Sequence, residues 1–333
     1  MLTPPDGLSE ESLVSVLARH WRLSAASVSY RAVGWGSHHW EVTDSAGERW
    51  FVTADELHNK RVRLAESLEV AFERLRRALT AAAELRNHGC QFVIAPVPAE
   101  RGDVLVRAGD KFGVAIYPFV EGVSFQWGEF SAENRRAMLD MVIAVHTTPG
   151  AATVGAMTDD FAIPHWDELE TLLDPVALGD VPERGPFTRP VSHLVAANSR
   201  AIESLLDRYD ELAGQARRHP SRMVLTHGEP HPGNMMLTPD GWRLIDWDTA
   251  LFAPPERDLW SLDLGDGSLL DEYAAATGVR PAPHLLELYR IRWDLADMAI
   301  DVSRFTRPHR GTAEDDKAWQ VLSSLVERVG SED

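Results

Sequence analysis

The residue types best suited to chemistry gather in one run, THGEPHPGN, at residues 226–234. Proline or glycine at four of its positions excludes a helix, so we predict a rigid loop after the apolar pair 224–225. The loop carries a carboxylate, Glu229, and an amide, Asn234, five residues further on. A carboxylate in such a loop can orient a hydroxyl group or take its proton.

A β-hairpin is predicted directly after this loop. The segments 235–238 and 242–245 flank the turn sequence Pro-Asp-Gly, in which each residue type favours a turn. Folding back at this turn brings Asn234 nearly opposite Asp246, and opposed Cβ atoms of a hairpin lie about 4.5–5.5 Å apart. An amide oxygen and a carboxylate at that spacing can share one hard cation such as Mg²⁺.

The whole pattern resembles the catalytic and metal loops of kinase-like folds. With the sequence IDWD at residues 245–248, it resembles the aminoglycoside phosphotransferase family in particular. The resemblance implies that Glu229 is the catalytic base and that Asn234 and Asp246 hold Mg²⁺. It also implies that ATP or GTP supplies the phosphoryl group. The sequence departs from the family at Glu229, where the family usually has Asp.

Composition limits the partners. The 333 residues suffice for two lobes with sizeable cores. Asp and Glu number 51 against 33 Lys and Arg, which gives a net charge of −18. This excess disfavours nucleic acid, because phosphates need a basic surface. It favours a small cationic substrate, although simple solubility explains the charge equally well.

The cellular setting is predicted from what the sequence lacks. Cys90 is the only cysteine, which excludes an internal disulfide and a cysteine-rich zinc site. No signal peptide is recognised, and no apolar run approaches the ~20 residues that span a bilayer. We therefore expect a cytoplasmic enzyme without membrane contact, and the sequence leaves its oligomeric state open.

The first third of the chain is predicted to form a small lobe with an antiparallel sheet and one long helix. A short helix at residues 9–20 comes first, and a long amphipathic helix at 67–86 follows the first three strands. The strands are expected at residues 27–33, 39–43, 49–53, 92–94, 104–106 and 112–117.

The turn Gly34-Trp35-Gly36-Ser37 joins the first two of these strands. Glycine-rich turns let backbone N–H groups approach phosphates, although such a turn alone is a weak signal. In this context it resembles the nucleotide-covering loop of kinase-like folds. The resemblance assigns Gly34, Gly36 and Ser37 to nucleotide binding.

The lysine that kinase-like folds carry on the third strand is missing. Thr53 stands where it is expected. Lys60, in the next loop, is the nearest candidate to reach the phosphates, and it is equally well explained as a surface residue. Arg61 or Arg63 are further candidates. In the family, a glutamate of the long helix pairs with this lysine, and the sequence does not choose among Glu69, Glu73 and Glu84.

The boundary between lobes is predicted where strand 112–117 ends in an aromatic-Pro-apolar segment. Tyr117, Phe119 and Val120 are assigned to nucleotide binding, since a hinge can offer backbone groups to an adenine edge. The predicted divisions are an N-lobe at residues 1–117, a hinge at 118–123 and a C-lobe at 124–333.

The C-lobe is predicted to be larger and mostly helical. His146 and Asp258 are interpreted as structural, and Asp258 resembles a residue that braces the catalytic loop in the family. An irregular segment is expected at residues 148–190. Helices are expected at residues 131–146, 191–217, 253–260, 285–305 and 312–330.

Four C-lobe residues are candidates for substrate binding. Asp248 follows the metal loop, and the helix 285–305 carries Trp293, Asp294 and Asp297. In the family, acidic residues on C-terminal helices contact substrate ammonium groups. Asp294 and Asp297 lie three residues apart on one helix face, which a solvated surface explains equally well.

The sequence therefore predicts an α+β, two-lobed protein-kinase-like fold. The predicted reaction moves the γ-phosphoryl group of ATP or GTP to a hydroxyl of a small cationic molecule, foremost an aminoglycoside or aminocyclitol antibiotic. Another hydroxylated metabolite, such as an amino alcohol, a sugar or a macrolide, is the alternative substrate. A nucleotide-binding pseudokinase is the non-enzymatic alternative, which Thr53 and Glu229 favour and the intact Asn234 and Asp246 oppose.

Overall fold

The chain forms two compact units in the computed structural model, which describes residues 1–126, 128, 130–150, 155–174, 182–219 and 221–331. The first unit joins Met1–Lys60, Ser67–Asp159 and Arg222–Ala282. The second joins Arg61–Glu66, Asp160–Ser221 and Pro283–Asp333. This division follows packing within the chain, and the predicted hinge at residues 118–123 stays a prediction.

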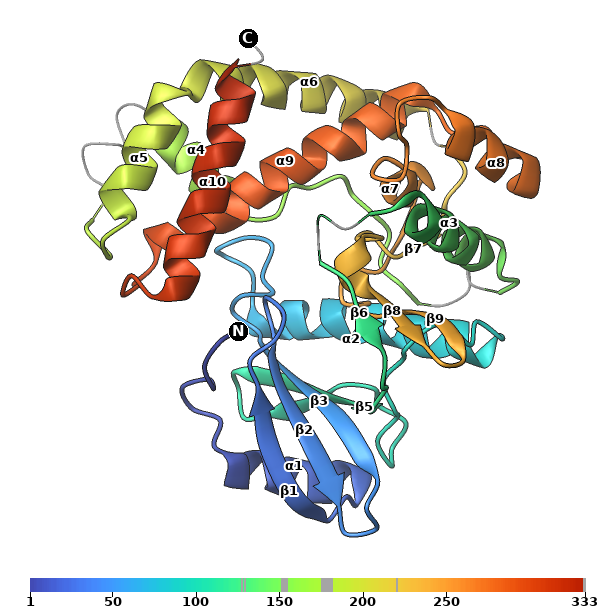
Figure 1. Ribbon diagram of the computed structural model, residues 1–333. Helices are drawn as coiled ribbons and strands as arrows, with labels where there is room; N and C mark the ends of the chain where they lie inside the picture. The colour runs from blue at the N-terminus through green and yellow to red at the C-terminus, as the bar shows by residue number, and fades with distance from the viewer. Residues whose placement is uncertain (127, 129, 151–154, 175–181, 220, 332–333) are drawn as a thin grey trace. The chain divides into compact units, whose positions relative to one another are not determined.

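The first unit contains a five-stranded antiparallel sheet, with its strands in the order β1-β2-β3-β5-β4. Figure 1 labels β1, β2, β3 and β5 of this sheet. The predicted strand at residues 92–94 is wrong, because only Val93 forms a single bridge, to Leu244. The strands are β1 (Ala25–Arg31), β2 (His38–Asp44), β3 (Arg49–Glu56), β4 (Val106–Ala108) and β5 (Phe112–Pro118).

One face of this sheet packs against α1 (Glu10–Trp21). Leu13 and Leu17 of this helix are fully buried, in one core with Val52 and Ile116 of the sheet. Because successive strand residues point to opposite faces, Thr53 and its neighbours of the same parity lie on the other side of β3.

That other face packs against α2 (Leu68–Asn87), the long helix of the sequence prediction. Leu75 and Leu79 of α2 form a core with Ala115, and Tyr117 packs against its edge. Ser67 begins the helix, since its side chain accepts a hydrogen bond from the backbone of Val70.

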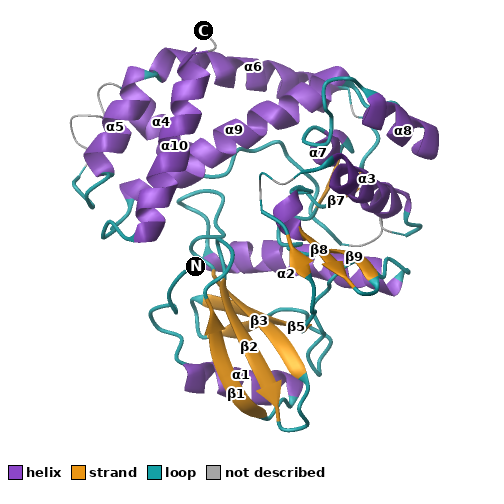
Figure 2. Cartoon of the chain, viewed as in Figure 1, coloured by secondary structure: helices purple, strands orange, loops and turns teal. Residues whose placement is uncertain are grey.

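The remaining elements of the first unit carry the predicted loop and hairpin (Figure 2). Strands β6 (Val123–Ser124), β8 (Met235–Thr238) and β9 (Gly241–Leu244) form a second antiparallel sheet, and β7 (Val224–Thr226) pairs with β10 (Leu251–Ala253). A short 3₁₀ turn, η3 (Pro232–Asn234), leads into β8. The helices are α3 (Ala132–Thr147), α7 (Glu256–Leu259) and α8 (Ser268–Thr277).

The second unit is helical. It contains α4 (Trp166–Leu173), α5 (Thr188–Ala197), α6 (Ser199–Arg218), α9 (Pro283–Thr306) and α10 (Ala313–Ser331). None of the helices in the described part of the chain is long and apolar enough to cross a membrane.

Two predictions for this unit are wrong. The segment 148–190 is not irregular throughout, because α4 lies within it; its residues 151–154 and 175–181 lie outside the described residues. Leu169 and Leu172 of α4 are buried, so packing against other helices stabilises an element too short to form alone. The single helix predicted at 191–217 is two helices. They break at Asn198, whose side chain donates to the carbonyl of Leu194.

A buried polar network joins α4 to α9. The carboxylate of Glu168 accepts hydrogen bonds from His165 at 2.9 Å, Ser303 at 2.8 Å and Arg307 at 2.8 Å. Burial alone would raise the pKa of Glu168, but these three donors outweigh it and lower the pKa to about 2. The ionised carboxylate is therefore part of the folded structure of this unit.

This network predicts an acid sensitivity. The pKa of Glu168 is lower in the folded chain, so its contribution of about 3 kcal/mol is present above pH 4.5 and is lost as pH falls towards 2. The urea midpoint of the wild-type chain should fall between pH 5 and 2 more steeply than that of Glu168→Gln, as measured by circular dichroism. Glu170→Gln, at an exposed position of the same helix, is the control and should follow the wild type.

Candidate active site

The loop after β7 is fixed at its start by one buried carboxylate. Asp258, within α7, accepts the backbone N–H of His227 at 2.8 Å and that of Gly228 at 2.6 Å. His146 of α3 approaches the same carboxylate at 3.1 Å, and its other ring nitrogen lies 3.0 Å from the hydroxyl of Tyr273. Burial would raise the pKa of Asp258, yet the hydrogen bond from His146 lowers it.

Gly228 has no room for a side chain. Its φ is +98°, and a Cβ atom placed there would lie 2.2 Å from the guanidinium of Arg257. That guanidinium is itself held, because it donates to the hydroxyl of Thr226 and to the carbonyl of Thr249, each at 2.8 Å. The glycine in the sequence run is therefore required by the close approach of Arg257.

Glu229 and Asn234 are tied to each other through the loop. The side-chain NH₂ group of Asn234 donates to the carbonyl of Glu229 at 3.0 Å. The side-chain oxygen of Asn234 therefore points away from Glu229. The carboxylate of Glu229 lies 3.8 Å from the ring of His231, and the Glu229 side chain is one-third exposed. Because the carboxylate is accessible, the hydroxyl group of a molecule bound from solution can form a hydrogen bond to it.

The hairpin forms as the sequence predicts. The register of β8 and β9 pairs Met235 with Leu244, and the N–H of Ile245 donates to the carbonyl of Asn234 at 3.0 Å. Asp246 is the next residue, and its φ of +66° is unusual for a non-glycine residue. This register sets Asn234 opposite Ile245, so the ladder ends one residue before Asp246.

Asp246 lies in a concentration of negative charge. Although Asp246 is exposed to solvent on one side, desolvation by the surrounding protein and the nearby carboxylates of Asp248 and Glu229 raise its pKa well above the usual range. A divalent cation fits this environment, since it would neutralise the carboxylates and displace the proton that they otherwise favour. The oxygen of the Asn234 side chain supplies a neutral ligand of the type that Mg²⁺ accepts.

No group of three or more His, Cys, Asp or Glu in the described residues has a metal-binding arrangement. A magnesium ion that uses one carboxylate, one amide oxygen and the oxygens of a bound nucleotide does not need such a group. The residues present therefore fit Mg²⁺ together with a nucleotide.

Lys60 belongs to the same cluster. Its ammonium lies 2.6 Å from the carboxylate of Asp248 and 3.0 Å from that of Asp55. Burial would lower the pKa of Lys60, but these two carboxylates raise it well above its usual value. The backbone after β3 thus brings this lysine to Asp248, just beyond the hairpin, although Thr53 leaves no lysine on the strand.

The glycine turn adjoins this ammonium. A Cβ atom at Gly36 would lie 3.9 Å from the Nζ atom of Lys60, and φ values of +69° and +80° at Gly34 and Gly36 explain the two glycines. Ser37 donates its hydroxyl to Asp55 at 2.5 Å. The glycine turn, Lys60 and Asp248 therefore lie next to one another.

The helix glutamates have other partners. Glu69 pairs with Arg107, Glu73 with Arg76 and Arg77, and Glu84 approaches His88. Lys60 instead pairs with Asp55, which the sequence analysis did not single out. Strand alternation indicated this residue, because Asp55 lies two positions after Thr53 on the same face of β3.

The three hinge residues lie around the end of β5. The hydroxyl of Tyr117 bonds to Thr53, and burial together with the charges of Asp55, Asp246 and Asp248 raises its pKa above its usual range. The N–H of Phe119 donates to the carbonyl of Arg49, so it is already paired. Phe119 and Val120 line a cavity of about 350 Å³ beside the hairpin turn.

The remaining substrate candidates lie in the second unit. Trp293, Asp294 and Asp297 belong to α9, and Asp294 forms an ion pair with Arg328 at 2.8 Å. Their contact with substrate stays a prediction.

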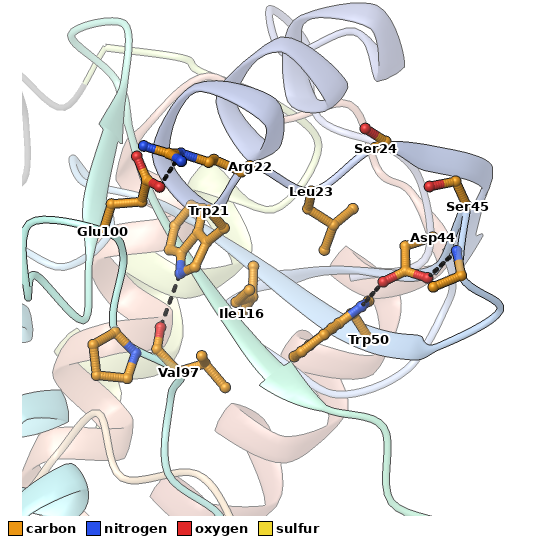
Figure 3. A pocket seen from close by; sticks show the side chains of 12 residues that line it. Trp21, Arg22, Leu23, Ser24, Asp44, Ser45, Trp50, Val97, Glu100 and Ile116 are labelled. Atoms are coloured by element: carbon orange, nitrogen blue, oxygen red, sulfur yellow. Dashed lines mark hydrogen bonds and ion pairs between the residues drawn. The ribbon is translucent and has the colours of Figure 1, made fainter.

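A second cavity of about 430 Å³ lies on the α1 side of the sheet (Figure 3). Trp21 donates its indole N–H to the carbonyl of Val97, and Trp50 donates to Asp44. The lining contains none of the predicted site residues, so this cavity is separate from the cluster around Lys60.

Fold and site together define a kinase-like phosphotransferase. The model of the phosphotransferase enzyme family matches residues 29–289, and Protein StrN of Streptomyces griseus is 32% identical over 250 residues, 73% of this chain and 74% of that protein. The chain belongs to the phosphotransferase enzyme family and is a small-molecule phosphotransferase.

Solved structures confirm the predicted two-lobed, kinase-like fold, and the family model bears out the resemblance to the aminoglycoside phosphotransferase family. A spectinomycin phosphotransferase in complex with ADP and spectinomycin has a TM-score of 0.70 at 14% identity, covering 97% of this chain and 98% of that chain. A microcompartment-associated aminopropanol kinase has a TM-score of 0.59 at 15% identity, covering 96% and 95%.

The close approach at Gly228 yields a paired prediction. Gly228→Ala adds left-handed strain and displaces Arg257, which should cost about 2–5 kcal/mol of unfolding free energy. Gly241→Ala has a similar φ of +104° but no atom within 4 Å of the new Cβ, so it should cost only about 1–2 kcal/mol. Urea denaturation measures both, and equal losses would contradict the role of Arg257.

Proposed function

We propose that this protein transfers the γ-phosphoryl group of ATP or GTP to a hydroxyl of a small cationic molecule, foremost an aminoglycoside or aminocyclitol. One observation carries the proposal: the first unit gathers Glu229, Asp246, Asp248 and Lys60 around the end of the hairpin. A base, metal ligands and a phosphate-binding ammonium are the parts that phosphoryl transfer requires.

Glu229 is the proposed base. Its carboxylate orients the acceptor hydroxyl and takes its proton as the new phosphate ester forms. Glutamate reaches one methylene further than the usual aspartate, and the loop held by Asp258 sets where that carboxylate begins. Positioning dominates this chemistry, so a longer side chain on a fixed loop is compatible with it.

Asn234 and Asp246 would hold Mg²⁺. When bound, the ion offsets negative charge on the phosphate oxygens. Lys60 adds a second positive charge from the side of the glycine turn, where its ammonium lies near Gly36. The N–H of Phe119 is paired within the sheet, so an adenine contact from the hinge would use its carbonyl or Val120.

The substrate class rests on charge and on relatives. The net charge of −18 attracts cations. A structural relative was solved with spectinomycin, and another is an aminopropanol kinase. An amino alcohol is therefore the main alternative acceptor, with sugars and macrolides behind it. The single cysteine and the need for a nucleotide fit a cytoplasmic enzyme.

The pseudokinase alternative has less support. Its main argument was the missing strand lysine at Thr53, and Lys60 lies beside the metal loop. Its second argument, Glu229, still needs a kinetic test.

The first experiment is a mass-spectrometric screen. The protein, Mg²⁺ and ATP or GTP are incubated with aminoglycosides, aminocyclitols and simple amino alcohols, and we expect one phosphoryl group on a cationic acceptor. Asp246→Ala should lower turnover by about a thousandfold or more. Asp240→Ala, an exposed carboxylate in the turn of the same hairpin, is the control. Undiminished turnover in Asp246→Ala would remove the metal assignment.

Glu229 is tested by charge and length. Glu229→Gln keeps the shape but cannot accept a proton, so kcat should fall about 10²- to 10⁴-fold with little change in nucleotide KM. Glu229→Asp should retain more activity than Glu229→Gln, because a carboxylate remains. Equal kcat values for Glu229→Gln and the wild type would exclude Glu229 as the base.

A further inference from the structure

Asp55 contacts both the glycine turn, through Ser37, and the loop that carries Lys60. One of its oxygens, Oδ1, accepts the hydroxyl of Ser37 at 2.5 Å and lies 3.0 Å from the ammonium of Lys60. The residue is only 3% exposed. A buried carboxylate is costly unless it is paired, so these two contacts account for its presence in the sheet.

In the family, a strand carries the lysine and a helix carries its acidic partner. Here strand β3 carries the acidic partner, Asp55, and the following loop carries the lysine, Lys60. The glutamates of α2 that we considered as partners bind arginines or approach a histidine instead. Helix α2 still contributes, because Arg74 donates to the backbone carbonyl of Lys60 at 3.0 Å.

The arrangement leaves one donor of Lys60 for a ligand. An ammonium has three N–H groups, of which one is donated to Asp248, while the ion pair with Asp55 holds the ammonium from a second side. The third is available beside Gly36, whose added Cβ would lie 3.9 Å from Nζ. Without Asp55, the ammonium would be drawn only towards Asp248 and Asp246, away from the turn that Ser37 belongs to.

We propose that Asp55 is a positioning residue for the nucleotide: it holds Lys60 under the glycine turn and keeps the turn closed through Ser37. This inference rests on the proposed function, since it assumes that phosphates bind beside Lys60. It assigns no direct contact between Asp55 and the nucleotide.

The test is a double-mutant cycle that measures nucleotide binding without any acceptor. The dissociation constant of a fluorescent ADP analogue with Mg²⁺ is measured for the wild type, Asp55→Asn, Lys60→Met and the double variant. Asp55→Asn should weaken binding about ten- to hundredfold, as expected for a lost hydrogen bond to a charged group. In the Lys60→Met background, Asp55→Asn should change the dissociation constant by less than about threefold, because the ammonium that Asp55 positions is absent.

Two matched variants separate positioning from folding. Glu56→Gln removes the neighbouring carboxylate of β3, which lies 3.2 Å from His38, and should leave nucleotide binding within about twofold of the wild type. Asp55→Glu keeps the charge and should restore part of the loss. If Asp55→Asn does not fold, Ser37→Ala tests the other half of the bridge and should weaken binding about threefold or more.

Each outcome has one meaning. Equal losses from Asp55→Asn with and without Lys60, or tighter binding by Asp55→Asn, would overturn the inference, the latter because the carboxylate would then only repel phosphate. A wild-type chain that binds nucleotide but phosphorylates no acceptor contradicts the proposed function and leaves the cycle valid. A wild-type chain that binds no nucleotide overturns both.

Discussion

The balance of charge around Lys60 is the constraint on which the site depends. Asp55 is buried, Lys60 and Asp248 are half-buried, and Asp246 lies beside them at an exposed position. Burial opposes the charged forms of Lys60 and Asp248. Lys60 compensates Asp55 and Asp248, which leaves the negative charge of Asp246 without a full counterion. The site is thus prepared for a cation before any ligand arrives, which is the physical basis of the proposed magnesium site.

The second constraint is the rigidity of the loop that carries the proposed base. Asp258 receives two backbone N–H groups and His146, and Arg257 fills the space over Gly228. These contacts come from α3 and α7, so the position of Glu229 depends on packing far from it in sequence. A loop held in this way needs no rearrangement to present a carboxylate, and fixed positioning is what phosphoryl transfer uses most.

The proposed site differs from the family's pattern in the backbone positions that carry its charged groups. The positive charge comes from the loop residue Lys60 instead of strand position 53, and its partner Asp55 comes from the strand instead of the helix. The proposed base, Glu229, is one methylene longer than the usual aspartate. Such exchanges are possible because a charge acts through its position in space, and several backbone positions can deliver an ammonium to the same place.

What the sequence determined by itself was local. The hairpin follows from its Pro-Asp-Gly turn, and its register follows from the turn, so the pairing of Met235 with Leu244 was predictable. The helix begun by Ser67 and its apolar stripe were equally visible, because capping and periodicity act between close neighbours.

Only the tertiary structure decided the partners of residues far apart in the chain. Lys60 meets Asp248 across 188 positions, and no local pattern fixes that contact. The helix α4 and the break at Asn198 were missed because burial against other helices stabilises short elements that propensity alone does not. The fold class was thus readable from sequence, whereas the surroundings of each charge required knowing which other charges lie beside it.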